Sequence, residues 1–171
     1  AVHAAGESVE AVLPNAIDPA DFALDRPLGE RQSSVIALYH RHLVKGPDVL
    51  LRALEHIRSV RPDLPIRVFA ARPPSHRLPE RVEVHIRPAL ADLRDLYNDS
   101  AVLLHPSRSE GWPLVPMEAA ACGCAIVACA NPGVSECFTA GVSMQAVPVG
   151  DGVALGQGAL DVLADDALRI R

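Results

Sequence analysis

The sequence predicts a doubly wound α/β domain, in which helices cover both faces of a parallel sheet. Short aliphatic runs alternate with longer helical patterns along most of the 171 residues. The short runs are almost continuously apolar, as expected for parallel strands that are buried on both faces. Hydrophobic residues make up 49% of the chain and aromatic residues only 4%, so one aliphatic core can form.

Six short runs are predicted to be strands, because β-branched and other aliphatic residues dominate them. In chain order they span residues 35–39, 66–70, 82–86, 101–105, 125–129 and, with a weaker pattern, 144–149. Right-handed crossovers between parallel strands then place helices on both faces of the sheet. Ligands of such sheets bind beyond the carboxyl ends of the strands.

Four helices are predicted between these strands, over residues 48–60, 89–97, 114–122 and 152–163. The first has apolar residues at a 3.6-residue period, and the segment 61–63 ends it. The second has Leu90, Leu93 and Leu96 on one face, and the third ends at Gly123, a typical helix C-terminus. This alternation of strands and helices defines the α/β class.

Residues 1–30 differ from the rest, because they are turn-rich and have no helical or strand period. We interpret them as an interdomain connection and residues 31–171 as one ligand-binding domain. The chain begins without Met and without a basic start followed by an apolar run, so we expect a fragment or a processed chain that has no signal peptide.

Charge and cysteine content exclude several classes of protein. The net charge is −5 without blocks of like charge, which is unlike a nucleic-acid binder. No apolar run approaches the roughly 18 residues of a membrane span. Cys122 and Cys124 are too close for an ordinary disulfide, and no His near the four cysteines completes a zinc site. We expect buried free thiols and a reducing compartment, the cytoplasm.

The turn after the first predicted strand is rich in cations. It contains His40, Arg41, His42 and Lys45, and a helix begins directly after it. Backbone amides at a helix start, together with Arg41 and Lys45, could hold a diphosphate. Taken alone, the same residues could equally form a solvated basic turn.

The loop after the fourth predicted strand combines two carboxylates with a helix start. Glu110 can reach one end of a bound ligand, and Gly111 allows close approach of the backbone. The amides around Trp112 and Leu114 can face a phosphate, and Glu118 can accept two vicinal ribose hydroxyls. The alternative is that Glu118 only complements the helix dipole and Glu110 is a surface charge.

A third turn, residues 131–136, follows the fifth predicted strand and therefore lies at the same edge of the sheet. We expect Glu136 to begin another short helix there. A carboxylate that stabilises a helix N-terminus is at least as good an interpretation of Glu136 as a ligand contact.

Several motifs together resemble one known family. Residues 110–118 read E-G-W-P-L-V-P-M-E, which resembles the E-x7-E motif of the retaining GT-B glycosyltransferases of the group 1, or family 4, type. Residues 118–128 resemble the E-A-x-A-C-G-x-P-V-V-A continuation of that motif. Lys45 and Gly46 resemble the K-G element, residues 13–18 resemble P-N-G-I/V-D, and residues 147–151 resemble P-x-x-D. These matches run in order through nearly the whole chain.

The resemblance implies the C-terminal, Rossmann-like half of a GT-B fold, which binds a nucleoside-diphosphate sugar. By resemblance, Glu110 contacts the donor sugar and is the catalytic residue, Glu118 holds the ribose, and Arg41 and Lys45 neutralise the diphosphate. No metal or other cofactor is implied. The acceptor, a glycan, a lipid or a small molecule, would be held by a missing N-terminal domain, so this chain alone would bind donor without transferring it. The implied location is cytoplasmic, and peripheral contact with the membrane in a full-length protein is kept open.

The sequence departs from the family pattern at four places. His40 or Arg41 stands where the family has an arginine, so either can contact the diphosphate. Pro113 replaces a common glycine and removes one amide donor. Ala16 replaces the glycine of the first motif, and residues 70–74 replace a G-x-G-like turn.

Two alternative functions are kept. One is a sugar-nucleotide epimerase of GT-B architecture, and the other is a non-enzymatic regulatory α/β domain that binds nucleotides. The spacing of Glu110 and Glu118, followed by Cys122 and Gly123, favours the transferase over the epimerase. An absence of nucleotide binding would favour the regulatory domain.

Overall fold

Six parallel strands form a single sheet in the order β3-β2-β1-β4-β5-β6. The structure is a computed structural model and describes residues 13–165, so the first twelve residues of the predicted interdomain connection lie outside the described part. The order of the strands reverses between β1 and β4, which are neighbours in the sheet. The strands are β1 Val35–Leu38, β2 Ile66–Ala70, β3 Val82–Ile86, β4 Val102–His105, β5 Ala125–Cys129 and β6 Gln145–Val147.

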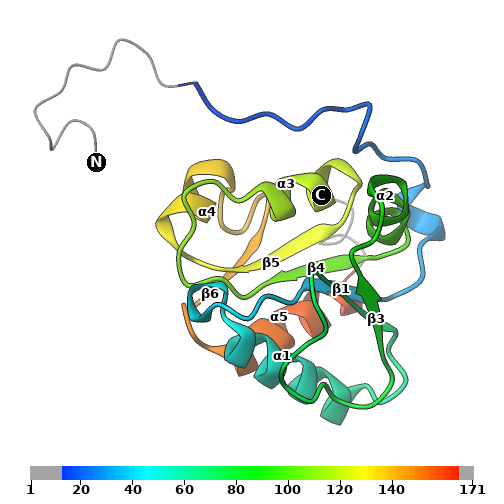
Figure 1. Cartoon of the computed structure of the whole chain (residues 1–171), viewed down its shortest axis with the longest axis vertical. Coiled ribbons are helices and arrows are strands. Elements are labelled where there is room, and N and C mark those ends of the chain that lie inside the picture. The colour runs from blue at the N-terminus through cyan, green and yellow to red at the C-terminus, as the bar shows by residue number, and fades with distance from the viewer. Residues whose placement is uncertain (1–12, 166–171) are drawn as a thin grey trace, which may run out of the picture.

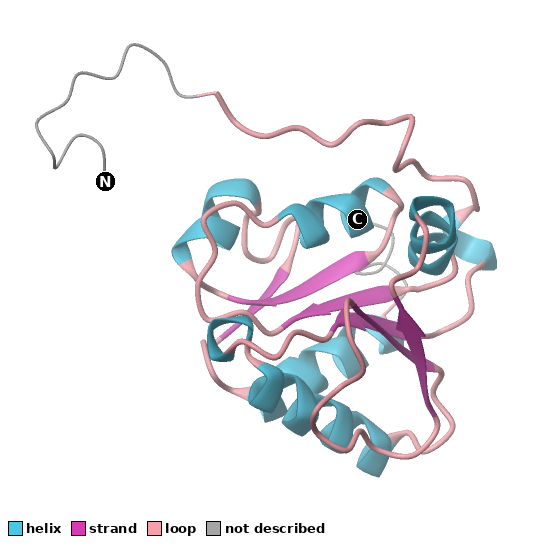
Figure 2. Cartoon of the chain, viewed as in Figure 1, coloured by secondary structure: helices cyan, strands magenta, loops and turns pink. Residues whose placement is uncertain are grey.

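Helices cover both faces of this sheet, as predicted (Figure 1). Helices α1 and α5 pack together on one face, and α2, α3 and α4 lie on the other (Figures 1 and 2). The helices are α1 Pro47–Val60, α2 Leu90–Asn98, α3 Leu114–Ala121, α4 Pro132–Cys137 and α5 Gly152–Ala164, with the 3-10 turns η2 Leu28–Glu30 and η3 Leu43–Lys45. The doubly wound prediction is therefore confirmed.

The sheet separates two hydrophobic cores. The core under α1 and α5 is dominated by aliphatic side chains. The core under α2 and α3 contains the aromatic residues Phe22, Phe69 and Tyr97. The rings of Phe22 and Tyr97 have centroids 5.9 Å apart, so the leading segment packs onto this face. That this segment connects two domains stays a prediction.

The sheet is less buried at its β3 edge than the sequence predicts. Val84 and Ile86 are 39% and 41% exposed, so burial on both faces is wrong for β3. Leu90 and Leu96 were predicted to share one face of their helix, but Leu90 is exposed and Leu96 is buried. The reason is position, because β3 is the edge strand and α2 begins just beyond it.

Helix α4 begins at Pro132, four residues before the predicted start at Glu136. Asn131 caps the helix, since its side-chain oxygen accepts a hydrogen bond from the backbone N–H of Val134 at 3.2 Å. Pro132 occupies the first turn, where its missing N–H costs nothing. Glu136 is exposed in the last turn, so its interpretation as an N-terminal carboxylate is wrong.

The prediction of free thiols is confirmed for all four cysteines, three of which are buried. Burial raises the pKa of Cys122 to about 11 and that of Cys124 to about 12, so both thiols stay protonated. Among residues 13–165, no helix is long and apolar enough to cross a membrane. No group of three or more potential metal ligands gathers within this same range.

Candidate functional site

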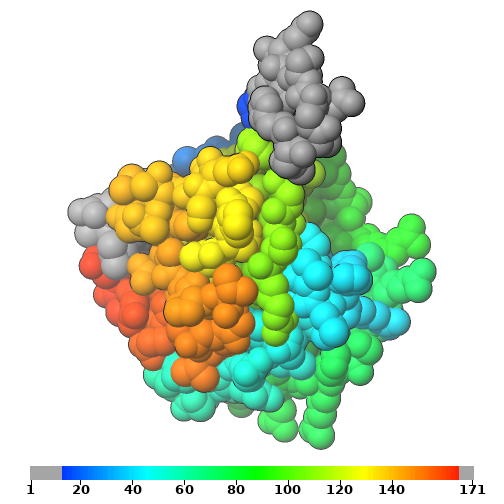
Figure 3. All heavy atoms as spheres, turned by 90° about the vertical axis from the view of Figure 1, so that its left-hand side faces the viewer, coloured from blue at the N-terminus to red at the C-terminus, as the bar shows by residue number. Residues whose placement is uncertain are grey.

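A pocket of about 170 Å³ lies at the carboxyl edge of the sheet, beside the point where the strand order reverses. Figure 3 faces this edge, with the turn after β1 in cyan and the loop after β4 in yellow-green. The position agrees with the rule that open α/β sheets bind ligands at such a reversal. The pocket is lined by Leu38, Lys45, His105, Pro106, Ser107, Glu110, Trp112, Pro113, Leu114 and Val115.

An ion pair between Lys45 and Glu110 occupies this pocket. The ammonium nitrogen of Lys45 lies 2.8 and 2.7 Å from the two carboxylate oxygens of Glu110, whose side chain is only 8% exposed. Nε2 of His105 lies 3.3 Å from Oε1 of Glu110, but at an angle that makes no hydrogen bond. Burial alone would raise the pKa of Glu110, but contacts with His105, Lys45 and Ser107 outweigh burial and lower the pKa to about 2. Glu110 is therefore an ionised carboxylate that can only accept hydrogen bonds.

Gly46 places Lys45 against the end of β4. Its φ of 66° lies in the left-handed region. Gly46 is both the C-cap of η3 and the N-cap of α1. A Cβ atom on Gly46 would lie 2.2 Å from the carbonyl oxygen of Pro106. Only glycine therefore allows the turn after β1 to approach the loop that carries Glu110.

Residues of two helices and of one helix cap hold the Glu110 loop in place. Arg108 pairs with both carboxylate oxygens of Asp48 in α1, at 2.9 and 2.8 Å. The side-chain amide of Asn131 donates to the carbonyl of Ser107 at 3.0 Å. Gly133 in α4 has no room for a Cβ atom, which would lie 2.2 Å from the carbonyl oxygen of Glu110. The third turn therefore supports this loop through Asn131 and Gly133 rather than through Glu136.

The start of α3 offers fewer free amides than expected. No side chain caps the helix, and Pro113 and Pro116 have no N–H. The Leu114 amide already donates to the carbonyl of Trp112 at 3.0 Å. The amide of Val115 has no partner among the described residues, and neither has the buried indole nitrogen of Trp112. The backbone amides of Gly111 and Trp112, just before the helix, also donate no hydrogen bond within the described range.

Gly111 is exposed, and a Cβ atom on it would meet no other atom within 4 Å. The protein itself therefore does not require glycine at this position. The expected close approach of a ligand to Gly111 stays a prediction.

Glu118 lies farther along α3 and does not line the pocket of Glu110. Its Oε2 accepts a hydrogen bond of 3.1 Å from the hydroxyl of Tyr97 in α2. Burial raises the pKa of Glu118, and the hydrogen bond from Tyr97 offsets this only in part. Burial and the neighbouring charge of Glu118 raise the pKa of Tyr97, so this hydroxyl stays a donor.

His40 and Arg41 also lie outside the pocket. Arg41 donates to the carbonyl of Pro73, in the loop after β2, at 2.9 Å. Nδ1 of His40 accepts the backbone N–H of His42 at 3.1 Å. Of the residues singled out from the sequence, the structure brings together Lys45, Glu110, Trp112 and Leu114, and it leaves His40, Arg41, Gly111 and Glu118 outside the pocket.

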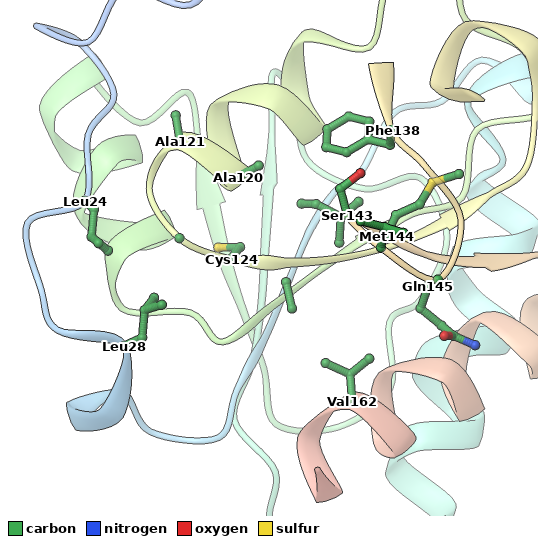
Figure 4. A pocket seen from close by; sticks show the side chains of 15 residues that line it. Leu24, Leu28, Ala120, Ala121, Cys124, Phe138, Ser143, Met144, Gln145 and Val162 are labelled. Atoms are coloured by element: carbon green, nitrogen blue, oxygen red, sulfur yellow. The ribbon is translucent and has the colours of Figure 1, made fainter. Parts of the chain in front are cut away.

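A larger cavity, of about 370 Å³, lies at the other edge of the sheet, near the amino ends of β5 and β6 (Figure 4). Phe138, Met144 and Val162 line it, and Ser143 and Gln145 are among its few polar side chains. None of the described residues that line it is an Asp, a Glu or a Lys, so the smaller pocket is the better candidate for chemistry.

A family model described as "Glycosyl transferases group 1" matches residues 34–165. The chain belongs to the glycosyl transferases group 1 family. The match includes the pocket and every strand of the sheet. Membership in this family favours a transferase over the alternative of an epimerase.

Two curated relatives of this glycosyl transferases group 1 chain are named D-inositol 3-phosphate glycosyltransferase. The one from Kribbella flavida is 32% identical and covers 84% of this chain, and the one from Xylanimonas cellulosilytica is 33% identical and covers 87%. The chain spans only 38% and 39% of the length of these two relatives.

Solved structures of other proteins share this fold. The C-terminal domain of a group 1 family protein from Francisella tularensis aligns with a TM-score of 0.74 at 16% identity, covering 91% of both chains. HepE from Anabaena, solved in complex with UDP-glucose, aligns with a TM-score of 0.72 at 19% identity over 91% of this chain and 48% of its own. The predicted fold, the C-terminal half of a GT-B glycosyltransferase, is confirmed.

Proposed function

We propose that this chain is the donor-binding domain of a retaining glycosyltransferase and binds a nucleoside-diphosphate sugar. The observation that carries the proposal is the Lys45–Glu110 ion pair, which lies in a pocket at the reversal point of the sheet. A cation beside an ionised, mostly buried carboxylate suits a ligand with a diphosphate at one end and sugar hydroxyls at the other.

Glu110 is proposed as the catalytic residue that contacts the donor sugar. Because its pKa is about 2, it is ionised at neutral pH and accepts hydrogen bonds from sugar hydroxyls. Its loop is fixed by Arg108, Asn131 and Gly133, so little reorganisation is needed when the donor binds. Such preorganisation is what electrostatic stabilisation of a transition state requires.

Lys45 is proposed to hold the diphosphate, since Arg41 and His40 lie outside the pocket. The Val115 amide and the indole N–H of Trp112 supply two further donors without adding net charge. When the bond between sugar and phosphate breaks, negative charge grows on the diphosphate, and these donors stabilise it. The proposal therefore needs no metal ion and no organic cofactor.

Glu118 is proposed to hold the ribose of the donor. The Tyr97 hydroxyl occupies one of its oxygens and fixes the carboxylate, which leaves Oε1 to accept ribose hydroxyls. A bound ribose would also replace part of the hydration that burial removes from this carboxylate.

The acceptor is proposed to come from a separate N-terminal domain, because the chain spans about two fifths of its relatives. The names of these relatives point to an inositol phosphate acceptor, and HepE is a neighbour that binds UDP-glucose. We therefore propose a UDP-sugar as the first donor to test. The chain alone would bind donor without transferring the sugar.

Calorimetry tests the proposed function with UMP, UDP and UDP-glucose, with GDP and ADP as further bases, in the presence of a chelator. We expect UDP to bind more tightly than UMP, and Lys45→Ala to abolish measurable binding of UDP. Arg61→Ala is the matched control, because Arg61 is exposed at the end of α1 and lies outside the pocket. Equal affinity for UMP and UDP would contradict the diphosphate site.

The same titrations separate the two glutamates. Glu118→Gln should weaken UDP and UDP-glucose alike, by about 1–3 kcal/mol for a charged hydrogen bond. Glu110→Gln should weaken only UDP-glucose. Glu136→Gln is the control, because Glu136 is exposed on α4 and lies outside the pocket. If Glu110→Gln and Glu118→Gln weakened both ligands equally, the assignment of Glu110 to the sugar and of Glu118 to the ribose of the donor would be wrong.

A further inference from the structure

His105 is a buried histidine that faces the carboxylate of Glu110. It is the last residue of β4, and its side chain is only 7% exposed. Its Nε2 lies 3.3 Å from Oε1 of Glu110 and makes no hydrogen bond with any described residue. A buried nitrogen without a partner is costly, so His105 has a hydrogen-bonding capacity that the free chain does not use.

Lys45 satisfies Glu110 in the free chain. Its ammonium contacts both carboxylate oxygens, at 2.8 and 2.7 Å, and its positive charge balances the carboxylate. The proposed function assigns the same ammonium to the diphosphate of the donor. A single point charge that turns to a diphosphate gives up at least part of its contact with the carboxylate. Glu110, whose side chain is 8% exposed, then loses its balancing charge, which is strongly unfavourable for a buried carboxylate.

The pocket itself holds a second group that can balance Glu110. Three of the residues that line it are ionisable, namely Lys45, His105 and Glu110. The nearby guanidinium of Arg108 is already bound to both carboxylate oxygens of Asp48. When Lys45 turns to the diphosphate, His105 is therefore the group of the pocket that can take over its role.

The elements packed against β4 bring no competing charge into the pocket, as far as the structure describes them. Strand β1 has no ionisable side chain, and Cys129 of β5 is a buried thiol whose pKa is raised by burial. Glu118 of α3 lies outside the pocket, and Asp161 of α5 and Glu136 of α4 are exposed. The charge of His105 therefore depends mainly on the two charged groups of the pocket.

We propose that His105 is a positioning residue for Glu110 and takes up a proton when the donor draws Lys45 away, and this rests on the proposed function. In the free chain Lys45 alone balances the carboxylate. In the donor complex the ammonium pairs with the diphosphate, and a proton from solvent converts the imidazole of His105 into an imidazolium. The imidazolium donates to Oε1 of Glu110, which leaves the other oxygen to accept sugar hydroxyls. No covalent bond forms or breaks in this exchange.

Calorimetry with UDP-glucose at pH 7.5 counts the protons, because the observed enthalpy changes with the ionisation enthalpy of the buffer in proportion to the protons taken up. A free imidazole is largely neutral at this pH, and UDP-glucose has no phosphate group that titrates there. With Hepes, Tricine and Tris as buffers, we expect an uptake of roughly half to one proton per UDP-glucose. His105→Gln and Glu110→Gln should each bring the uptake close to zero.

His85→Gln is the matched control. Nε2 of His85 lies 3.0 Å from Oε1 of Glu83 and also makes no hydrogen bond with a described residue, but this pair lies on the edge strand β3, outside the pocket. The control should keep the proton uptake of the wild type. His105→Ala should weaken UDP-glucose binding by about tenfold. His105→Gln retains a neutral donor, so it should restore most of this affinity without the proton.

A second measurement tests His105 without any donor. Lys45→Met keeps the length of the side chain but removes its charge, so His105 is left to balance Glu110. In an NMR titration of the imidazole signals, the midpoint of His105 should rise by about one to two pH units in Lys45→Met. The midpoint of His85 should not change. An unchanged midpoint of His105 would overturn the proposal.

The outcomes separate this inference from the proposed function. Uptake that persists in Glu110→Gln but not in His105→Gln would show that His105 contacts the donor directly, and would overturn its positioning role. Binding of UDP-glucose to the wild type without proton uptake would overturn the inference and leave the proposed function standing. Absence of binding of any nucleotide sugar would refute the proposed function, whereas a raised midpoint in Lys45→Met would still support the coupling of His105 to Glu110.

Discussion

Two loops at the same edge of the sheet are held in very different ways. The loop after β4, which carries Glu110, is fixed by Gly46, Asp48, Asn131 and Gly133 from two separate parts of the chain. The loop after β2 is held at the β1 end mainly by the Tyr39 hydroxyl and one guanidinium, and most of its residues are exposed.

The difference follows from what each loop has to hold. A mostly buried carboxylate with a low pKa is costly unless its partners stay in place. Exposed arginines stay hydrated and carry no such cost, so their loop needs few contacts. A loop held by many contacts therefore fixes the geometry of one side chain. A loop held by few contacts presents a surface that can adjust to a ligand.

Gly46→Ala should cause the largest loss. The new Cβ would meet the carbonyl of Pro106, and the left-handed φ adds strain, so we expect the free energy of unfolding to fall by about 3 kcal/mol. Urea denaturation measures this. Gly141→Ala is the control, because Gly141 also has a positive φ, but its Cβ would meet nothing within 4 Å. Equal losses in both variants would show that the close approach to the Glu110 loop is unimportant.

Asn131→Ala should come next, with a loss of about 2 kcal/mol. It removes the cap of α4 and leaves the buried carbonyl of Ser107 without its donor. Affinity for UDP-glucose should fall more than affinity for UDP, because the Glu110 loop loses one support. Ser135→Ala, on the exposed face of the same helix, should change neither quantity. A variant with lower stability but unchanged sugar affinity would contradict the positioning role of Asn131.

Glu110 should make stability depend on pH in the acid range. Its pKa is about 2 in the folded chain and about 4.3 when unfolded, so the unfolded state binds its proton first as pH falls. The stabilisation is present above about pH 4.3 and disappears as pH falls toward 2. We expect about 1–2 kcal/mol, because Lys45 is partly exposed. Glu110→Gln should remove this dependence between pH 5 and pH 3, measured by denaturation at each pH.

Glu118 has a raised pKa, so Glu118→Gln should change the dependence in the opposite sense.

Tyr39→Phe should have the smallest effect. It removes the hydroxyl that ties the loop after β2, and we expect a loss of about 1 kcal/mol. Trypsin should cut faster after Arg77, while the pH dependence attributed to Glu110 stays unchanged. A loss as large as that of Asn131→Ala would remove the contrast between the two loops.

Local patterns predicted the fold well, because strands and amphipathic helices depend on near neighbours in the sequence. They also predicted that Lys45 and Glu110 would lie at the same edge of the sheet, because both follow strands that end there, but they did not predict the ion pair between them. Arg108, Asn131 and Gly133 were missed as supports of the site, because their contacts join residues far apart in the chain. The helix start at Glu136 was predicted wrongly, although Asn131 followed by Pro132 is the stronger sequence signal for a cap.

The sequence alone could not show whether His40 or Arg41 reaches the pocket. The motif left His40 and Arg41 as alternatives for one position, whereas the structure places both outside the pocket. The reason is the loop after β2, where Pro73 supplies a carbonyl that draws Arg41 away from Lys45. The departure from the family pattern at residues 70–74 therefore determines the direction of the Arg41 side chain.

The buried Arg31 has a mechanical consequence. Its guanidinium donates to carbonyls at the C-terminal ends of α2 and α3, namely those of Tyr97, Ser100 and Cys122, and also to the carbonyl of Arg26 in the leading segment. One rigid planar group thus connects the leading segment to the two helices that carry Tyr97 and Glu118. A force applied along the leading segment would therefore reach both helices through Arg31, and with them the hydrogen bond between Tyr97 and Glu118.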